Sequence, residues 1–486
     1  MPAPFPALRL FCTCWLIYAV HWAPFLIREE FPAVTLATRG TLNVERFLGW
    51  TADIFPSPAG GAFINNNPGA SIVGAIPLLV AHPLLNAIER WNDTLPSSVD
   101  RSRHASRFPA IPAVQARREW YFMVVAFLTV AGLMAPVSAL AASALGWTLW
   151  RGGLPRQRAI AAALIFGFAT PVFVRTEYLN HNLLVCHAGL LAALVLWNAP
   201  GSGVSVRRAV AAGALGGFAV LCDYSGILAL AAAAAYAWLR AGDGETGFGH
   251  RLRIALGYAA GAAPMLLALA VYQHWAFGYS ALPSQHFMPA IEQTARGYRG
   301  MSWPSLELLT TNFFDTRFGL FAVCPLLALG LAAPFVQRSR FRLPDREMWL
   351  VLTFFSAFTL FCASNQYSRL QWTTGIRYLV PTIPGLLLLS LQVVDILPSA
   401  VRGPILMTSL IMAWLPAVTQ GSIWAVFRNA SDLQLSWIHR MAEYGALSHP
   451  VRVTAVVLVT TAAAVTVIWR RELVRAATTV ETAGGE

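Results

Sequence analysis

The chain has 486 residues, of which 56% are hydrophobic and only 12% are charged, and its mean hydropathy is +0.55. A soluble domain carries about 25% charged residues, so this composition excludes a water-soluble globular protein and predicts an integral membrane protein. The net charge of +12 comes from arginine alone, because the chain contains no lysine. The arginines cluster in short loops between apolar segments, as cytoplasmic loops do, so the basic charge does not indicate nucleic-acid binding.

Apolar segments of roughly 20 residues recur along the chain, which predicts an all-α, polytopic transmembrane bundle rather than a β-barrel of alternating strands. The first segment lacks a small-residue cleavage site and is expected to remain as a signal anchor. About twelve spans are predicted in all. Their approximate cores are 8–27, 119–149, 158–175, 183–198, 209–222, 225–240, 254–275, 319–336, 348–364, 378–397, 404–419 and 450–469.

The arginine clusters orient these spans with both termini in the cytoplasm, which predicts a multi-pass protein of the plasma (inner) membrane. The segment 69–89 is apolar enough to form another span, but counting it would place the later arginine clusters outside. It is therefore predicted to be a re-entrant or interfacial helix in a long first extracytoplasmic loop, 28–118. A middle extracytoplasmic loop is expected at 276–318 and a cytoplasmic tail at 470–486, within a single integral membrane domain, 1–486.

The first span leads into the acidic pair Glu29 and Glu30, which follows Arg28. Carboxylates at a membrane boundary are costly unless they are solvated or serve a purpose. One of the two could act as a general base that takes a proton from an acceptor hydroxyl. The alternative is a solvated helix end beside Arg28. Asp53 lies further along the same loop, and the stretch 31–48 could form a helix at the membrane interface.

Polar groups also mark the later extracytoplasmic turns. Asn67 ends a run of three asparagines before Pro68-Gly69, where the amides would cap the next helix or attract an anion. Glu177 and His181 belong to a polar island between two apolar spans, and His286 lies in the middle loop. His181 has no second histidine or carboxylate at a helix-face metal spacing such as HExxH, and neither a metal nor a cofactor is predicted.

Arginines at outer membrane entries, Arg317 and Arg377 among them, depart from the usual preference for the cytoplasmic side. Guanidinium groups match phosphate oxygens, so such an arginine could hold the phosphate of a lipid carrier. The alternatives are a side chain that reaches up to the interface, and internal pairing with Asp315 or Glu307.

Four places in this pattern together resemble the GT-C superfamily of polytopic glycosyltransferases, which includes the dolichyl-phosphate-mannose protein mannosyltransferases and the bacterial aminoarabinose transferases. The resemblance spans about residues 8–390. Each motif is short, but their order and their predicted side of the membrane agree. The matching segments are Arg28-Glu29-Glu30 with Thr38-Arg39-Gly40, Asn67-Pro68-Gly69-Ala70-Ser71, Arg317-Phe318-Gly319-Leu320-Phe321, and Gly375-Ile376-Arg377-Tyr378-Leu379.

The resemblance implies inverting transfer of a sugar from a polyprenyl-phosphate donor to a lipid, glycan or protein acceptor on the extracytoplasmic face. It implies Glu29 or Glu30 as the base, with Glu30 favoured, although the family usually has Asp-Glu where this chain has Glu-Glu. Arg377, and less directly Arg317, would bind the donor phosphate. Further candidates for substrate contact are Tyr378, Asp53, Asn67, His286, Glu177 and His181.

Two other functions remain open at this point. One is a transporter or flippase for a lipid-linked or polar solute, although such proteins usually place ionisable groups near the bilayer midplane and contain inverted repeats. The other is a catalytically inactive membrane partner that shares the GT-C architecture.

Overall fold

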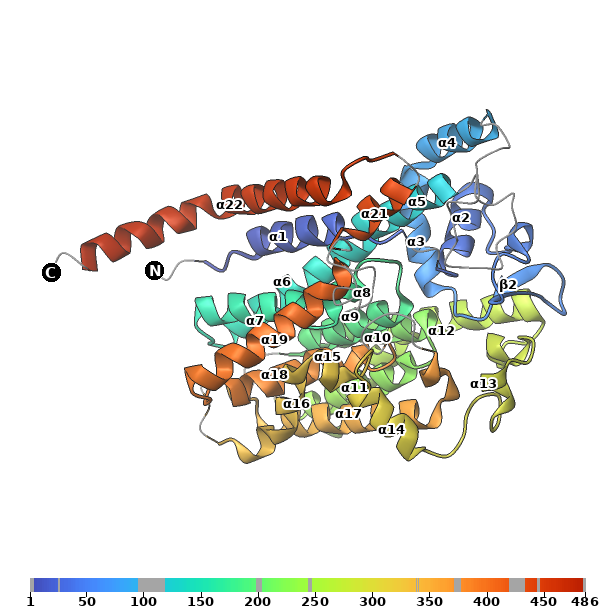
Figure 1. The fold of residues 1–486 in the computed structure, drawn as a ribbon. Coiled ribbons are helices and arrows are strands. Elements are labelled where there is room, and N and C mark those ends of the chain that lie inside the picture. Colours follow the sequence, from blue (N-terminus) through green and yellow to red (C-terminus); the bar gives the residue numbers. More distant parts are fainter. Residues whose placement is uncertain are drawn as a thin grey trace.

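The structure, a computed structural model, describes residues 4–24, 27–94, 119–197, 203–243, 247–337, 339, 341–370, 377–418, 433–443 and 446–483. Within these ranges the chain forms an almost entirely helical bundle (Figure 1). The strands described are two short ones, β1 (Ile54–Pro56) and β2 (Ala62–Ile64), which pair in antiparallel fashion. The predicted all-α class is confirmed.

The long helices run roughly parallel to one another along the bundle. They are α1 (Ala7–Val20), α5 (Glu119–Thr129), α6 (Ala135–Arg151), α7 (Arg156–Phe168), α9 (His181–Leu196), α10 (Val206–Cys222), α11 (Gly226–Ala241), α12 (Phe248–Phe277), α17 (Asp345–Ser364), α18 (Ile383–Val394), α19 (Ser399–Ala417) and α22 (Pro450–Ala483).

Other elements, most of them shorter, lie between these helices. They are α2 (Glu30–Arg39), η1 (Glu45–Phe47), α3 (Gly69–Val80), α4 (His82–Thr94), η4 (Val130–Met134), α8 (Val172–Arg175), η5 (Ser284–His286), α13 (Glu292–Ala295), α14 (Leu306–Phe314), α15 (Leu320–Val323), α16 (Pro325–Ala328), η6 (Leu329–Phe335), η7 (Gln366–Arg369), η8 (Val380–Thr382) and α21 (Ser436–Glu443).

Five of the described helices are long and apolar enough to cross a membrane, or six if the bent pair of α3 and α4 counts as one span. Most of the other predicted spans correspond to shorter apolar helices such as α9, α11 and α18. A membrane-spanning helical bundle is thus confirmed, but many of its helices are shorter than the ~20 residues of a full crossing.

Proline and glycine end several helices earlier than predicted. The first helix stops at Val20 rather than near 27, shortly before Pro24. The predicted span 319–336 is three short helices, and Pro325 and Pro334, which lack amide protons, lie within it. Helix α2 ends at Gly40, which adopts a left-handed conformation with φ of 66°, so the helix expected over 31–48 is shorter.

The segment 69–89 bends as a re-entrant element would. Helices α3 and α4 meet at an angle of 78°, and their apolar residues continue across the break. In Figure 1 this pair lies with α2, the strands and α13 at one end of the bundle, whereas α1 begins and α22 ends at the other. The acidic and polar loop residues therefore gather at the end opposite to both chain termini.

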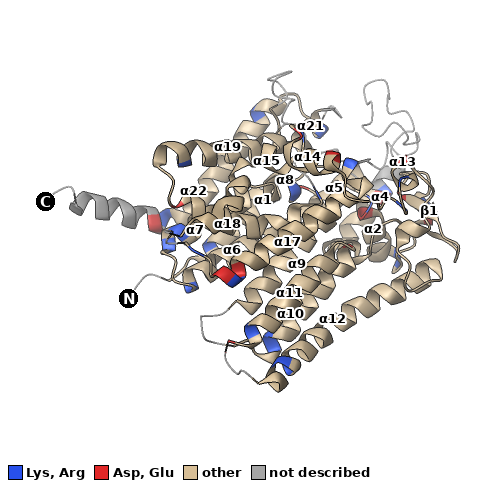
Figure 2. Cartoon of the chain, turned by 90° about the horizontal axis from the view of Figure 1, so that it is seen from below, with Lys and Arg blue, Asp and Glu red and all other residues tan. Residues whose placement is uncertain are grey.

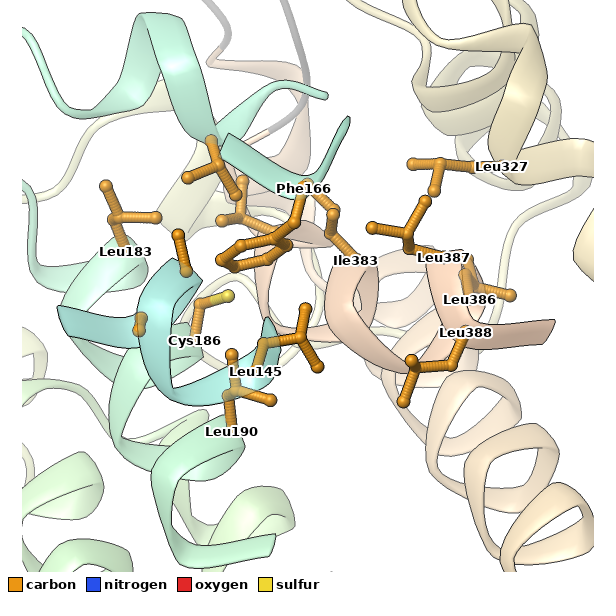
Figure 3. Packing of buried hydrophobic residues seen from close by; sticks show 14 of the residues in the cluster. Leu145, Phe166, Leu183, Cys186, Leu190, Leu327, Ile383, Leu386, Leu387 and Leu388 are labelled. Carbon is orange, nitrogen blue, oxygen red and sulfur yellow. The ribbon is translucent and has the colours of Figure 1, made fainter. Parts of the chain in front are cut away.

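The bundle core is apolar and closely packed. Figure 3 shows Phe166 of α7 among Leu145, Cys186 and Ile383, which come from three other helices. The six cysteines are all unpaired, and five of them are buried, as expected for small core residues.

Glycine lets α10 and α12 approach one another closely. A Cβ atom on Gly213 would lie 2.0 Å from the carbonyl oxygen of Tyr258. A Cβ atom on Gly261 would lie 2.0 Å from the carbonyl oxygen of Val210. Small residues permit this kind of contact between membrane helices, so the α10–α12 interface depends on them.

We expect Gly213→Ala to destabilise the protein by about 1–3 kcal/mol, because the added methyl group must push the two helices apart. Gly249→Ala in the first turn of α12 is the matched control, since its Cβ would meet no atom within 4 Å. Melting temperatures in detergent should fall for the first variant and stay near wild type for the second. Equal melting temperatures for both variants would contradict the close contact.

Candidate functional site

The carboxylate of Glu29 is held by the neighbouring Arg28 and by two groups from distant segments of the chain. Its Oε1 lies 2.7 Å from Nδ1 of His181, accepts a hydrogen bond of 3.3 Å from Nε of Arg28, and accepts another from Nδ2 of Asn66. The Oγ of Ser71 donates to the backbone carbonyl of Glu29 at 2.8 Å. These contacts tie the loop after α1 to the starts of α3 and α9.

The second carboxylate oxygen of Glu29 is in a different situation. Oε2 is buried and has no hydrogen-bond partner among the described residues. Buried polar atoms in proteins are nearly always hydrogen-bonded, so an exception calls for a reason. Glu29 therefore has one oxygen that is fixed by three side chains and one that has no hydrogen-bond partner among the described residues.

The surroundings of Glu29 keep it ionised. Burial, the largest influence, opposes ionisation, but the charges of His181 and Arg28 together outweigh it and lower the pKa of Glu29 to about 2. Arg28 also pairs with Asp53, with 3.2 Å between its Nη1 and Oδ1 of the carboxylate. Glu29 is consequently a carboxylate, and not a carboxylic acid, at neutral pH.

His181 connects Glu29 to a second acidic residue. The Oδ1 of Asn180 accepts a hydrogen bond from the amide of Leu183 and so caps α9, which places His181 in its first turn. The Nε2 atom of His181 lies 2.9 Å from Nδ2 of Asn182 and 3.6 Å from Oδ2 of Asp223, at the end of α10. The imidazole thus bridges Glu29 and Asp223.

Glu30, the favoured base in the sequence interpretation, lies outside this polar cluster. Its side chain is fully buried, and its Oε2 accepts a hydrogen bond of 3.3 Å from the amide of Ile27. Burial raises the pKa of Glu30 well above its usual value, and the neighbouring charge of Glu29 adds to this effect. Of the two carboxylates, Glu29 is thus the one held by His181, Arg28 and Asn66, and Glu30 is buried apart from them.

The raised pKa of Glu30 makes stability depend on pH. Above the usual glutamate pKa of 4.5, the unfolded chain loses a proton that the folded chain keeps, so stability falls as pH rises toward the folded pKa. Glutamine resembles the protonated side chain at every pH. We expect Glu30→Gln to melt at a higher temperature than wild type, by a margin that grows between pH 5 and pH 8.

The control for this experiment is Glu307→Gln. The hydrogen bond from Arg369 lowers the pKa of the exposed Glu307, so its replacement should not stabilise the protein as pH rises. A difference in melting temperature between Glu30→Gln and wild type that stays constant from pH 5 to pH 8 would contradict a protonated Glu30.

The two candidate phosphate-binding arginines, Arg377 and Arg317, differ in burial and in their side-chain partners. Arg377 is buried, donates a hydrogen bond of 3.0 Å from Nη2 to the hydroxyl of Tyr378, and lies over that ring at 4.7 Å. Tyr378 also interacts electrostatically with Arg28 of the cluster. Arg317, in contrast, is 70% exposed and binds Asp315 through both Nε and Nη2. The internal pairing considered from the sequence thus applies to Arg317.

The other predicted residues divide into those that join the cluster and those that do not. Asp53 joins it through Arg28 and through Nδ2 of Asn65, at 3.2 Å. Asn67 instead supports the fold, because its Nδ2 donates to the carbonyl of Val220 at 2.7 Å. The ring of His286 packs against Phe287 and has no hydrogen bond to the cluster within the described ranges.

Glu177 is a further buried acid. Neither of its carboxylate oxygens has a hydrogen-bond partner in the described part of the chain. Burial raises the pKa of Glu177 well above its usual value, and the charge of Arg175 offsets this only in part. Its backbone carbonyl accepts a hydrogen bond of 2.7 Å from the amide of Ala23, which joins the turn before α9 to the end of α1.

The sequence interpretation did not assign site roles to Arg28, Asn66 and Asp223. Arg28 was treated only as a neighbour of the acidic pair, and Asn66 only as part of an amide run that would cap a helix or attract an anion. The signal for Asp223 was its position in an outer turn at the end of an apolar span. Among the described residues, no group of three or more His, Cys, Asp or Glu side chains is placed to hold a metal ion.

No family model and no curated protein matches the chain. Among solved structures, it is similar to the crystal structure of ArnT from Cupriavidus metallidurans bound to undecaprenyl phosphate. That similarity has a TM-score of 0.48 and 16% sequence identity, and it covers 95% of this chain and 74% of that one. A similarity at this level assigns no residue a role.

Proposed function

We propose that the chain is an inverting glycosyltransferase that moves a sugar from a polyprenyl-phosphate donor to a lipid, glycan or protein acceptor on the extracytoplasmic face. The single observation that carries the proposal is the Glu29 carboxylate, which is ionised, fully buried and hydrogen-bonded through one oxygen only. It lies at the end of a membrane bundle where the polar loops gather, next to Arg28, which interacts electrostatically with Tyr378 of the Tyr378–Arg377 pair.

Glu29 would accept the proton of the acceptor hydroxyl at Oε2, while His181, Arg28 and Asn66 hold Oε1. The acceptor oxygen forms a bond to C1 of the sugar as the C1–O bond to phosphate breaks, and the electron pair of that bond leaves with the phosphate. A pKa of about 2 makes Glu29 a weak base. A weak base suffices here, since the acceptor oxygen becomes strongly acidic as it bonds to an oxocarbenium-like sugar.

Arg377 would bind the phosphate that departs. A phosphate leaving group needs no general acid, but its growing negative charge is stabilised by a guanidinium group in a buried site. Arg377 is held in place by its stacking on the ring of Tyr378. Arg28 contributes a second positive charge, because it interacts electrostatically with both Glu29 and Tyr378.

The position of the cluster also favours an enzyme over a transporter. Transporters usually bind their substrates near the bilayer midplane, at broken helices. Here Glu29, His181 and Asp223 lie at the ends of elements that face the loop layer. A site at that level can meet the sugar of a lipid carrier and an acceptor from the aqueous side.

The donor class is tested by binding. A polyprenyl phosphate should raise the melting temperature of the purified protein in a saturable way, whereas the uncharged polyprenol of the same length should have little effect. The phosphate-specific shift should be lost in Arg377→Ala. Equal shifts with the phosphate and with the alcohol would count against a site for a lipid-linked phosphate.

A further inference from the structure

A second cavity with charged residues lies at the opposite end of the bundle. Helices α7, α18 and α19 border a cavity of about 190 Å³, together with the segment around Phe341. These three helices lie next to one another, far from α2 and α13 (Figure 1). The cavity is therefore separate from the Glu29 cluster.

The lining of this cavity changes from charged to apolar along the helices. Arg158 lies in the first turn of α7, Arg402 in the first turn of α19, and Asp395 just past the end of α18. Ile165 lies seven residues beyond Arg158, which is about 10 Å along a helix. The apolar lining residues include Ala161, Ile165, Leu391 and Val394. One end of the cavity is thus charged, and the wall extending into the bundle is hydrocarbon.

Among the described lining residues, the charged end has two arginines and one aspartate. Arg158 pairs with Asp395, with 2.7 Å between Nη1 and Oδ1, and the hydroxyl of Ser339 lies 3.4 Å from the other oxygen of Asp395. Arg402 forms no ion pair with any residue that the structure describes, and its side chain is exposed. The fixed Arg158 and the available Arg402 together complement a group of charge −1.

Further arginines lie at this end of the bundle. Figure 2 shows arginines near α7 and at the starts of α10 and α12. This is the end that the arginine distribution assigns to the cytoplasm. The cytoplasmic leaflet is rich in anionic lipids, and basic pockets between membrane helices on this side bind their head groups.

We propose that this cavity binds an anionic phospholipid of the cytoplasmic leaflet. Its phosphodiester lies between Arg402 and the Arg158–Asp395 pair, and the start of an acyl chain packs along Ile165 and Leu391. The bound lipid fills the space between α7, α18 and α19 and stabilises their packing. The site does not depend on the proposed transfer reaction, so it can be tested whether or not that proposal holds.

The test uses the purified full-length protein in detergent, titrated with dioleoyl-phosphatidylglycerol or dioleoyl-phosphatidylcholine while thermal stability is followed. We expect the anionic lipid to stabilise the wild type at lower concentration than the zwitterionic lipid. Arg402→Gln should bind the anionic lipid about fivefold more weakly, as expected for the loss of one arginine near an anionic lipid surface. The response to the zwitterionic lipid should not change.

Arg342→Gln is the matched control. Arg342 lies at the same end of the bundle and is exposed, but it pairs with Asp345 and does not line the cavity. It should bind the anionic lipid as the wild type does. Equal binding by Arg402→Gln and wild type, equal loss in both variants, or an equal response to inorganic phosphate alone would overturn the proposal.

Discussion

Replacing Glu29 by glutamine should reduce sugar transfer by roughly a thousandfold, which is within the usual contribution of a general base. Glutamine has nearly the same shape but cannot accept the proton of the acceptor hydroxyl. Donor binding should change little, because the phosphate-binding groups are left in place. The measurement is kcat for donor consumption, with donor affinity determined separately by thermal shift.

Glu30→Gln provides the matched control for this prediction. Its side chain is buried beside the amide of Ile27 and does not contact the His181–Arg28 cluster. We expect its kcat to stay within about threefold of wild type, since glutamine mimics the protonated acid that the buried site favours. A large loss in Glu30→Gln together with near-normal activity in Glu29→Gln would reverse the assignment of the base.

The second large effect is expected at Arg377. Removing a charged hydrogen-bond donor from a buried site costs about 1.5–3 kcal/mol, so Arg377→Ala should lower kcat/KM for the donor by roughly 10–100-fold. Arg377→Lys should recover only part of this loss, because an ammonium group lacks the planar fork that matches phosphate. Steady-state kinetics at varied donor concentration measure the change.

Arg317→Ala is the natural comparison. Arg317 is exposed and already satisfied by its two hydrogen bonds to Asp315, so its removal should alter kcat/KM by less than about threefold. If Arg317→Ala were the more damaging substitution, the donor phosphate would have to bind at the middle loop. That result would separate the phosphate site from the Tyr378–Arg377 pair.

The overall architecture follows from the sequence because long apolar runs leave a chain few alternatives in a membrane. For the segment 69–89 the sequence predicted a re-entrant or interfacial helix, and the sharp bend between α3 and α4 fits a broken span as well as a re-entrant loop. Its apolar residues permit a span, but the arginine distribution on either side argues against one. Helix ends were less predictable, as the early stop of α1 at Val20 shows. Apolar residues continue past that point, so hydropathy alone does not mark the end.

The choice between Glu29 and Glu30 depends on contacts that neighbouring sequence does not encode. Adjacent residues at the start of a helix point in different directions, and a shift of one residue exchanges them. Here the direction is set by Ser71, which binds the backbone of Glu29, and by His181, which lies 152 positions further along the chain. The pairing of Arg317 with Asp315 is local, and the sequence had raised it as an alternative.

Donor turnover by the wild-type protein tests the central claim most directly. The purified protein, in lipid nanodiscs with a membrane lipid extract as acceptor source, would be given a panel of polyprenyl-phosphate sugars. The quantity to measure is the polyprenyl phosphate released. We predict release with at least one donor by wild type, and its near-complete loss in Glu29→Gln. The absence of release with every donor, from folded protein that still binds polyprenyl phosphate, would contradict a glycosyltransferase and favour a lipid carrier or transporter.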